Sequence, residues 1–156
     1  MAITKPIRDA LRASFYPMVF ERGFELDKRY QPQMVEFRRF TEDKVHIFSS
    51  RWDKYQRAKF VIDFSDAPRD GIEWCGQFMR AEVMSPVHCG HYRRLGYRGG
   101  KLGFRWFNQR RPLLDQLTSF KRNFTPQEIA DQVIERYPEM EAWWRDRTIG
   151  PHVSAY

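Results

Sequence analysis

Cysteine and long apolar runs are both scarce in this sequence. Two cysteines in 156 residues are too few for the disulfide framework of a small secreted domain, so a reducing compartment is the simpler setting. The apolar runs extend for only a few residues, far short of a membrane span, and the first residues lack the apolar core of a signal peptide. We therefore expect a cytoplasmic protein that has no membrane partner.

Metal-binding and catalytic signatures are missing as well. One cluster of metal-ligating side chains stands out, made of Cys75, His88, Cys89 and His91. Zinc usually takes two spaced pairs of ligands, and adjacent residues such as His88 and Cys89 seldom reach one ion. At the glycine-rich stretch 96–103, Leu95 just before it and Leu102 within it stand where a phosphate-binding P-loop needs glycine and Ser or Thr. We expect no metal, no cofactor and no enzymatic activity, and an enzyme of unknown class is our third hypothesis.

Apolar and aromatic residues are plentiful although their runs are short. They make up 42% and 16% of the chain, with 13 phenylalanines and 5 tryptophans. A disordered chain does not carry such an apolar load, and 156 residues suffice for one hydrophobic core. We expect a single folded domain over residues 1–156.

The N-terminal segment has the periodicity of an amphipathic helix. Within residues 4–22, apolar side chains recur at four-residue spacing: Ile7, Leu11, Phe15 and Val19. Pro17 lacks the N–H that the helical ladder needs, so it is expected to kink or break this helix.

The C-terminal segment starts with the strongest local signal in the chain. Residues 125–128 have the pattern of a capping box, with Thr125 as the cap and Pro126 at the first helical position. The predicted buried stripe of this helix consists of Ile129, Val133, Ile134 and Tyr137. Pro138 is expected to break the helix, before a second short helix that carries Met140, Trp143 and Trp144.

Between these segments, apolar and polar side chains alternate as they do in half-buried strands. Strands are predicted around Val35 and Phe37, at residues 45–50 and at residues 60–65, with less certain edges at 72–74, 78–84 and 102–107. A hairpin loop at residues 53–57 makes its two flanking strands antiparallel. A short helix is predicted after Pro112. The expected fold is therefore α+β, an antiparallel β-sheet flanked by an N-terminal helix and C-terminal helices.

The positive charge of the chain is concentrated in one segment. Residues 90–123 contain nine lysines or arginines and a single acid, Asp115, for a net charge of +8, whereas the whole chain carries +7. Charge spread evenly would indicate solubility alone, whereas a local block indicates an anionic partner.

Aromatic residues are interleaved with this basic block. We predict a partner-binding face made of Arg93, Arg94, Tyr97, Arg98, Lys101, Arg105, Trp106, Arg110 and Arg111. Arginine and aromatic side chains are the usual anchors of protein interfaces. The same residue types also grip single-stranded nucleic acid, so a nucleic-acid-binding module is the alternative, although only weak binding is expected without a recognition motif.

One stretch of the chain is similar to a known motif. Residues 51–60 read Arg-Trp-Asp-Lys-Tyr-Gln-Arg-Ala-Lys-Phe and resemble a hairpin of an uncharacterised bacterial family, the domain of unknown function 4304, whose members tend to read Gln-Trp-Asp-Lys-Tyr-Gly-Arg-Pro-Arg-Phe. Weaker likeness extends to residues 23–24, 106–107, 141–144 and 150–152. The chain departs from the motif at Arg51, Gln56, Ala58 and Lys59, and Gln56 in place of glycine suggests a differently shaped turn.

The resemblance implies one α+β domain and no established activity. Small bacterial single-domain proteins of this kind often act as immunity or antitoxin-type inhibitors, or in defence against phage. We therefore expect a non-enzymatic binding protein of this sort, which docks its basic, aromatic face on an acidic protein partner such as a toxin or another effector.

Overall fold

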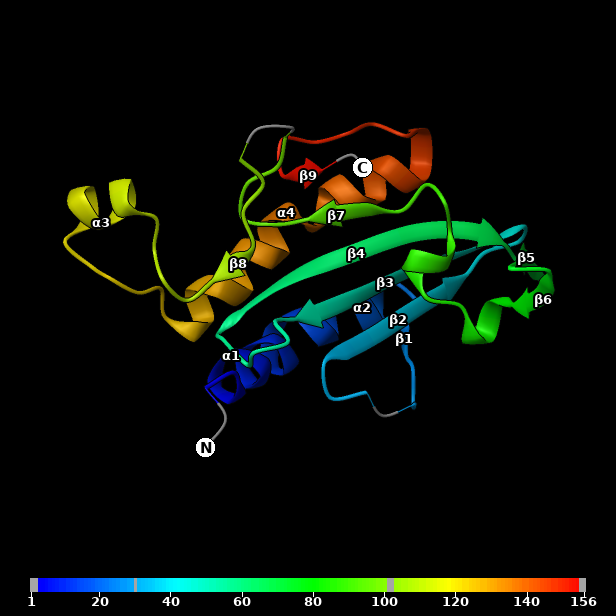
Figure 1. Ribbon diagram of the computed structural model, residues 1–156, viewed down its shortest axis with the longest axis horizontal. Helices are drawn as coiled ribbons and strands as arrows, with labels where there is room; N and C mark the ends of the chain where they lie inside the picture. Colours follow the sequence, from blue (N-terminus) through cyan, green and yellow to red (C-terminus); the bar gives the residue numbers. More distant parts are fainter. Residues whose placement is uncertain (1–2, 30, 101–102, 155–156) are drawn as a thin grey trace.

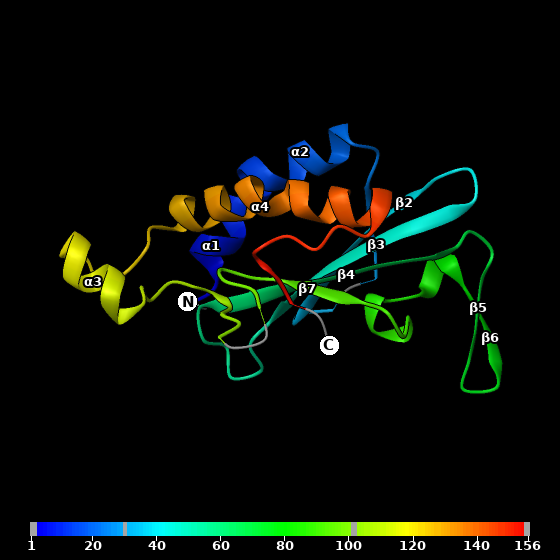
Figure 2. The ribbon, with the colours of Figure 1, turned by 90° about the horizontal axis from the view of Figure 1, so that it is seen from above.

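An antiparallel β-sheet with helices packed on one face forms the body of the protein (Figures 1 and 2). The structure is a computed structural model and describes residues 3–29, 31–100 and 103–154. The sheet contains β1 (Glu25–Leu26), β2 (Met34–Phe40), β3 (Lys44–Trp52), β4 (Lys59–Pro68), β7 (Arg93–Leu95), β8 (Phe107–Asn108) and β9 (Val153–Ser154). Its order is β1-β2-β3-β4-β7-β9, with β8 also paired to β4. The predicted α+β fold class is confirmed.

The strand pairs include the hairpin that the sequence predicts. In the register of β3 with β4, Phe48 lies opposite Phe64 and Trp52 lies opposite Phe60. A separate hairpin, β5 (Gly71–Trp74) with β6 (Gln77–Arg80), extends from the far end of β4 (Figure 1). The strand predicted at 78–84 ends at Arg80, because residues 81–83 form a 3-10 turn. Of the strand predicted at 102–107, only Phe107 lies in a strand, and residues 101–102 are outside the described part of the chain.

The N-terminal helix continues through Pro17. It consists of α1 (Lys5–Ala10), the π-helical turn η1 (Leu11–Phe15) and α2 (Tyr16–Glu21), in direct succession. The N–H of Tyr16 bonds to the carbonyl of Leu11, five residues back, so the wider turn lies directly before the proline. A wider turn relieves the contact between the proline ring and the preceding carbonyls. The expected disturbance at Pro17 is therefore a local π-helical turn and not a break.

The C-terminal helix, α4 (Pro126–Asp146), also runs through its proline. The capping box is present, since Glu128 N–H donates to the Thr125 hydroxyl at 3.1 Å and Thr125 N–H donates to Glu128 Oε2 at 2.7 Å. The prediction of a break at Pro138 is wrong. Pro138 is exposed, so water can reach the carbonyl that loses its donor, and the residues on both sides of it bury one continuous apolar stripe.

The main core lies between this helical layer and the sheet. Both helical segments contribute their predicted stripes to it, and the sheet contributes Phe37, Phe48, Phe60, Ile62 and Phe64. The predicted stripe residues of the N-terminal helix are all buried. A smaller cluster covers part of the opposite face of the sheet and contains Val45, Ile47, Ala67, Ala81, Met84 and Cys89.

The residues of the hairpin motif have structural roles. Trp52 is buried and stacks on Phe60 with ring centroids 4.6 Å apart. Asp53 closes the loop, because it accepts hydrogen bonds from Tyr55 N–H at 3.0 Å and from the Arg57 guanidinium at 2.8 and 2.9 Å. These bonds from Arg57 hold the pKa of Asp53 well below its usual range. Gln56 adopts φ of 59°, the left-handed conformation that glycine takes at no steric cost.

Candidate partner-binding site

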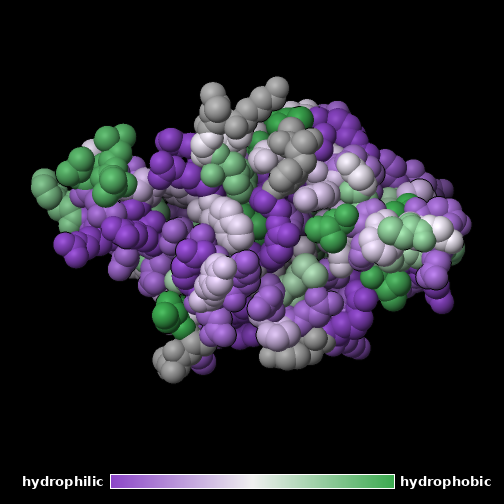
Figure 3. Space-filling view, in the orientation of Figure 1, coloured by the Kyte–Doolittle hydropathy of each residue, from purple (hydrophilic) through white to green (hydrophobic). Residues whose placement is uncertain are grey.

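Helix α3 (Leu113–Ser119) projects from the body of the protein beyond the end of α4 (Figures 1 and 2). None of its residues is buried. Four large apolar side chains on and after the helix are between 71% and 94% exposed: Leu113, Leu114, Leu117 and Phe120. They form a hydrophobic group at the left end of the molecule in Figure 3, and we call them the apolar ridge.

A few polar contacts orient α3. The Tyr97 hydroxyl donates to Asp115 Oδ2 at 2.6 Å, and Gln116 Nε2 donates to the Arg111 carbonyl at 2.7 Å. Burial and the neighbouring Asp115 carboxylate raise the pKa of Tyr97, so its hydroxyl keeps its proton and remains a donor. The helix ends at Phe120, whose φ is 56°. These contacts give the ridge a defined direction, although most of the surface of its side chains is exposed.

A cavity of about 480 Å³ opens at the base of α3. Its lining includes the basic residues Lys59, Arg105, Arg110 and Arg111, and the aromatic residues Tyr97, Trp106 and Phe124. Lys59 Nζ lies 4.9 Å from the centroid of the Trp106 ring, and the Arg111 guanidinium lies 4.1 Å from that of Phe124. We call these seven residues the basic cavity. It borders the apolar ridge at Leu113.

The structure brings five of the nine predicted site residues together in this cavity. They are Tyr97, Arg105, Trp106, Arg110 and Arg111. Arg105 and Arg110 are exposed and make no ion pair with any residue in the described ranges. Arg111 is different, because its guanidinium pairs with Glu128 at 3.1 Å and is mostly covered. Arg111 therefore supports the base of α3 more than it faces a partner.

Two of the predicted site residues lie elsewhere, which corrects the expectation of one continuous basic face. Arg94 Nε donates to the fully buried Asp63 at 2.7 Å across β7 and β4. Arg93 lies over the Trp143 ring, 6.0 Å from its centroid. Both sit on β7, where pairing to β4 fixes the direction of their side chains. Arg98 is exposed in the loop after β7, and Lys101 lies outside the described residues.

The apolar ridge was not predicted from the sequence as part of a site. Its residues recur at positions 113, 114, 117 and 120, which is the spacing of a core-facing helical stripe. The one available signal is the charge around the stripe, since Arg110, Lys121 and Arg122 flank it closely. Core helices of similar length also carry such flanking charges, so exposure could not be inferred from the pattern.

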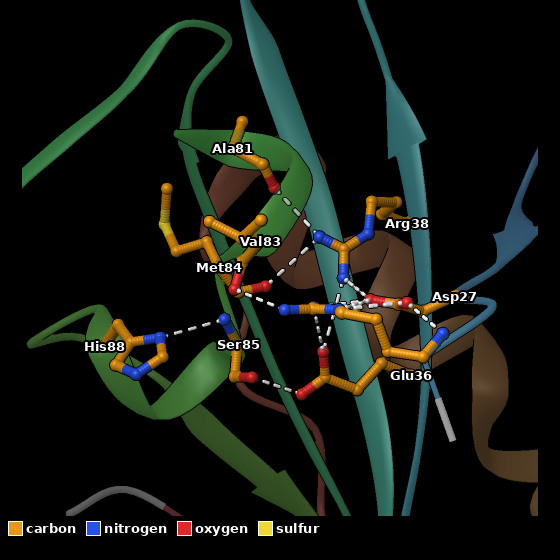
Figure 4. Close-up of polar contacts among 9 residues, drawn as sticks. Asp27, Glu36, Arg38, Ala81, Val83, Met84, Ser85 and His88 are labelled. Carbon is orange, nitrogen blue, oxygen red and sulfur yellow. Dashed lines mark hydrogen bonds and ion pairs between the residues drawn. The ribbon is translucent and has the colours of Figure 1, made fainter. Parts of the chain in front are cut away.

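A second polar cluster lies on the face of the sheet opposite α4 (Figure 4). Arg38 donates to Asp27 at 2.6 Å and to the carbonyls of Ala81 and Met84 at 2.9 and 3.3 Å. Glu36 accepts from Arg38 and from the Ser85 hydroxyl. Burial raises the pKa of Glu36, while these bonds oppose the shift. These contacts hold residues 81–85 against the sheet. The charged groups of the cluster pair with one another, so the cluster has a structural role.

The cysteines and histidines of the loop region are dispersed among separate contacts. Cys75 is exposed, whereas Cys89 is buried beside Met84. His88 Nδ1 accepts from Ser85 N–H, and His91 contacts the Asp66 carboxylate at 2.9 Å. Within residues 3–29, 31–100 and 103–154, no three His, Cys, Asp or Glu side chains form a group that could hold a metal. No described helix is long and apolar enough to cross a bilayer.

Comparisons with family models, curated proteins and solved structures find no match for this chain. The resemblance of residues 51–60 to a bacterial family therefore stays a prediction. The function has to be inferred from the geometry of the apolar ridge and the basic cavity.

Proposed function

We propose that this protein is a non-enzymatic binding protein that inserts its apolar ridge into a groove of an acidic protein partner. The observation that carries the proposal is the exposure of Leu113, Leu114, Leu117 and Phe120 on a helix that projects from the body. A contiguous apolar patch of this kind on a monomer marks an interaction site more often than a free surface.

The size of the apolar contribution supports a protein partner. Full burial of one Leu or Phe side chain stabilises by about 1.5–3 kcal/mol, so four of them supply a large part of a specific affinity. Interfaces are organised as an apolar centre with a polar rim. Here the ridge would form the centre, and the exposed bases beside it would form the rim.

The charge of the rim supports an acidic partner. Arg98, Arg105, Arg110, Lys121 and Arg122 are exposed around α3 and the basic cavity. Asp115, the single acid of this segment, is held by Tyr97. Such a field speeds association with an acidic surface and disfavours basic ones. An immunity or antitoxin-type inhibitor, which must find an effector quickly, would use both properties.

The basic cavity supports a non-enzymatic role. Its described lining contains no Asp, Glu, His, Cys or Ser, and its two other side chains of catalytic type are engaged, Lys59 over the Trp106 ring and Tyr97 with Asp115. The cavity instead offers cations and aromatic rings, which suit the carboxylates of a partner.

Nucleic-acid binding is the second candidate. The observation that favours it is the position of Trp106, a half-buried ring beside Lys59, Arg105 and Arg110. Stacking of a base on Trp106 would compete with Lys59, which already lies over the ring. Binding to phosphates and bases also leaves the apolar ridge exposed to water. For these two reasons, this candidate ranks below a protein partner.

Site-specific photo-crosslinking tests the proposal. A photo-reactive phenylalanine analogue is placed at Phe120 and, as a matched control, at Phe78, an exposed phenylalanine on β6 at the other end of the molecule. In cells that make the protein, position 120 should crosslink to one acidic protein, position 78 should not, and the double variant Arg105→Glu/Arg110→Glu should lose the product. Crosslinks at position 120 to nucleic acid or lipid, or equal products at both positions, would contradict it.

A further inference from the structure

A second and larger cavity is separate from the proposed partner-binding site. Its volume is about 850 Å³, within the range of small-molecule sites. Its lining comes from the N-terminal helix, from residues 26–29 and 31–35, and from Trp52, Asp53 and Gln56 of the hairpin motif. None of its lining residues belongs to the basic cavity or the apolar ridge.

Positive charge dominates the walls of this cavity. Its basic residues are Lys5, Arg8, Arg12, Lys28 and Arg29. The two acids in the lining are already engaged, because Asp27 pairs with Arg29 and Arg38 while Asp53 pairs with Arg57. Lys28 makes no ion pair with the described residues. Lys5 and Arg12 both pair with Asp9, at 2.5 and 3.2 Å, but Asp9 is partly exposed and lies outside the lining. An anion that entered the cavity would compete with this solvent-exposed pair, which is weak.

The helix presents its cations to the cavity on one side. Lys5, Arg8, Arg12 and Tyr16 follow one another at spacings of three and four residues, and all four line the cavity. The π-helical turn at residues 11–15 separates Arg8 from Tyr16. Turns of this type are frequent at functional sites. Arg8 is fixed over the Trp52 ring at 4.2 Å and donates to the carbonyl of Pro32 at 2.9 Å.

Part of the cavity lining is apolar, and two of the polar donors there have no acceptor in the described chain. Tyr16, Met34, Val35 and Trp52 supply apolar surface. The indole N–H of Trp52 is buried and has no hydrogen-bond partner among the described residues. The Tyr16 hydroxyl also has none there, and burial raises its pKa, so it keeps its proton. A buried donor without a partner destabilises the fold, so an acceptor on a ligand that reached the Trp52 indole N–H would be favoured.

We propose that this cavity binds an organic anion with an apolar body, such as a medium-chain carboxylate. Its acidic head would lie against Lys5, Arg8 and Arg12, beside the Trp52 ring over which Arg8 is placed, and its chain would lie over Met34 and Val35. This site shares no residue with the proposed partner-binding site, so an experiment can contradict one proposal without contradicting the other.

The test uses 1-anilinonaphthalene-8-sulfonate, a fluorescent anion with an apolar body, as the probe. The folded protein should bind one equivalent, and dodecanoate below its micellar concentration should displace it at least tenfold more effectively than dodecyltrimethylammonium, which has the same chain and the opposite charge. In NMR spectra, dodecanoate should shift the indole N–H signal of Trp52 and leave that of Trp106 in place.

Matched variants separate this site from general effects of charge. The double variant Lys5→Gln/Arg12→Gln removes two exposed cations from the cavity and should weaken dodecanoate binding at least tenfold. The variant Lys121→Gln/Arg122→Gln removes the same charge beside α3 and should leave it unchanged. No binding, equal displacement by both detergents, a shift of Trp106 in place of Trp52, or equal loss in the two double variants would overturn the proposal.

Discussion

The Tyr97 hydroxyl donates to Asp115 Oδ2 at 2.6 Å and thereby joins the loop after β7 to the projecting helix α3. Asp115 is the single acid among the nine bases of residues 90–123. The Asp115 carboxylate accepts this hydrogen bond, and it forms no ion pair with a base among the described residues. A seven-residue helix without buried residues is marginal alone, so this bond is expected to matter for its order.

We predict that Tyr97→Phe loosens α3 and leaves the rest of the fold intact. A hydrogen bond to a charged group contributes about 1.5 kcal/mol, which corresponds to roughly tenfold faster amide exchange in residues 113–120. Hydrogen exchange measured by mass spectrometry checks this. Tyr55→Phe is the control, because Tyr55 is exposed and its hydroxyl has no partner in the described residues. Equal exchange in both variants would show that Asp115 does not hold the helix.

The core prediction concerns Trp143. This side chain is 2% exposed and meets Phe64 edge-on, with ring centroids 5.4 Å apart. Trp143→Ala should lower the free energy of unfolding by about 3–5 kcal/mol, the usual cost of removing a large buried aromatic. Trp74 on β5 is 42% exposed and meets the His88 ring edge-on, outside the main core, so Trp74→Ala should cost much less, about 1 kcal/mol. Denaturant unfolding of both variants measures the difference, and similar midpoints would contradict the packing described.

The pH prediction concerns His46, which stacks on Trp144 with ring centroids 4.9 Å apart. Burial, assisted by the Arg39 guanidinium 2.9 Å from Nδ1, lowers the pKa of His46 to about 4 from 6.5. Between these two pH values, His46 is protonated in the unfolded chain but not in the folded chain. The free energy of unfolding therefore falls as the pH drops from about 6.5 towards 4.

NMR titration of the His46 ring should therefore give a pKa far below the ordinary value. His46→Phe keeps a ring on Trp144 and removes the titration, so its stability should fall less steeply across the same pH range. A His46 pKa near 6.5, or an unchanged slope in the variant, would contradict the environment described.

Local sequence signals predicted the helices, the central hairpin and the fold class, because these depend on periodicity and caps. The break expected at Pro138 did not occur, and the kink or break expected at Pro17 is only a π-helical turn, because continuous apolar stripes are buried on both sides of each proline. The position of Arg94 could not be predicted, because its partner Asp63 lies 31 residues away and meets it only through sheet register. The exposure of Leu117 could not be predicted either, because buried helices have the same spacing of apolar residues.

Nucleic-acid binding should be weak and strongly dependent on salt. Binding by Arg105 and Arg110 to phosphates releases counterions, so the affinity for a single-stranded oligonucleotide should fall steeply and vanish near physiological salt. Fluorescence anisotropy at several salt concentrations measures this. Submicromolar affinity at physiological salt, lost in Trp106→Ala, would reverse the order of the two candidate functions, since stacking adds about 1–3 kcal/mol per base.

The variant Phe120→Gly gives the most direct test of the proposed docking helix. Phe120 is exposed and adopts φ of 56°, which suits glycine, so the free energy of unfolding should not fall. Gln56→Gly is the matched control, since Gln56 is exposed with φ of 59° and lies far from α3 in the chain. For the partner identified by crosslinking, calorimetry should give an affinity at least about 30-fold weaker for Phe120→Gly, as loss of a central aromatic costs about 2 kcal/mol or more. The affinity of Gln56→Gly should equal that of the unaltered protein, and an unchanged affinity in Phe120→Gly would contradict the account.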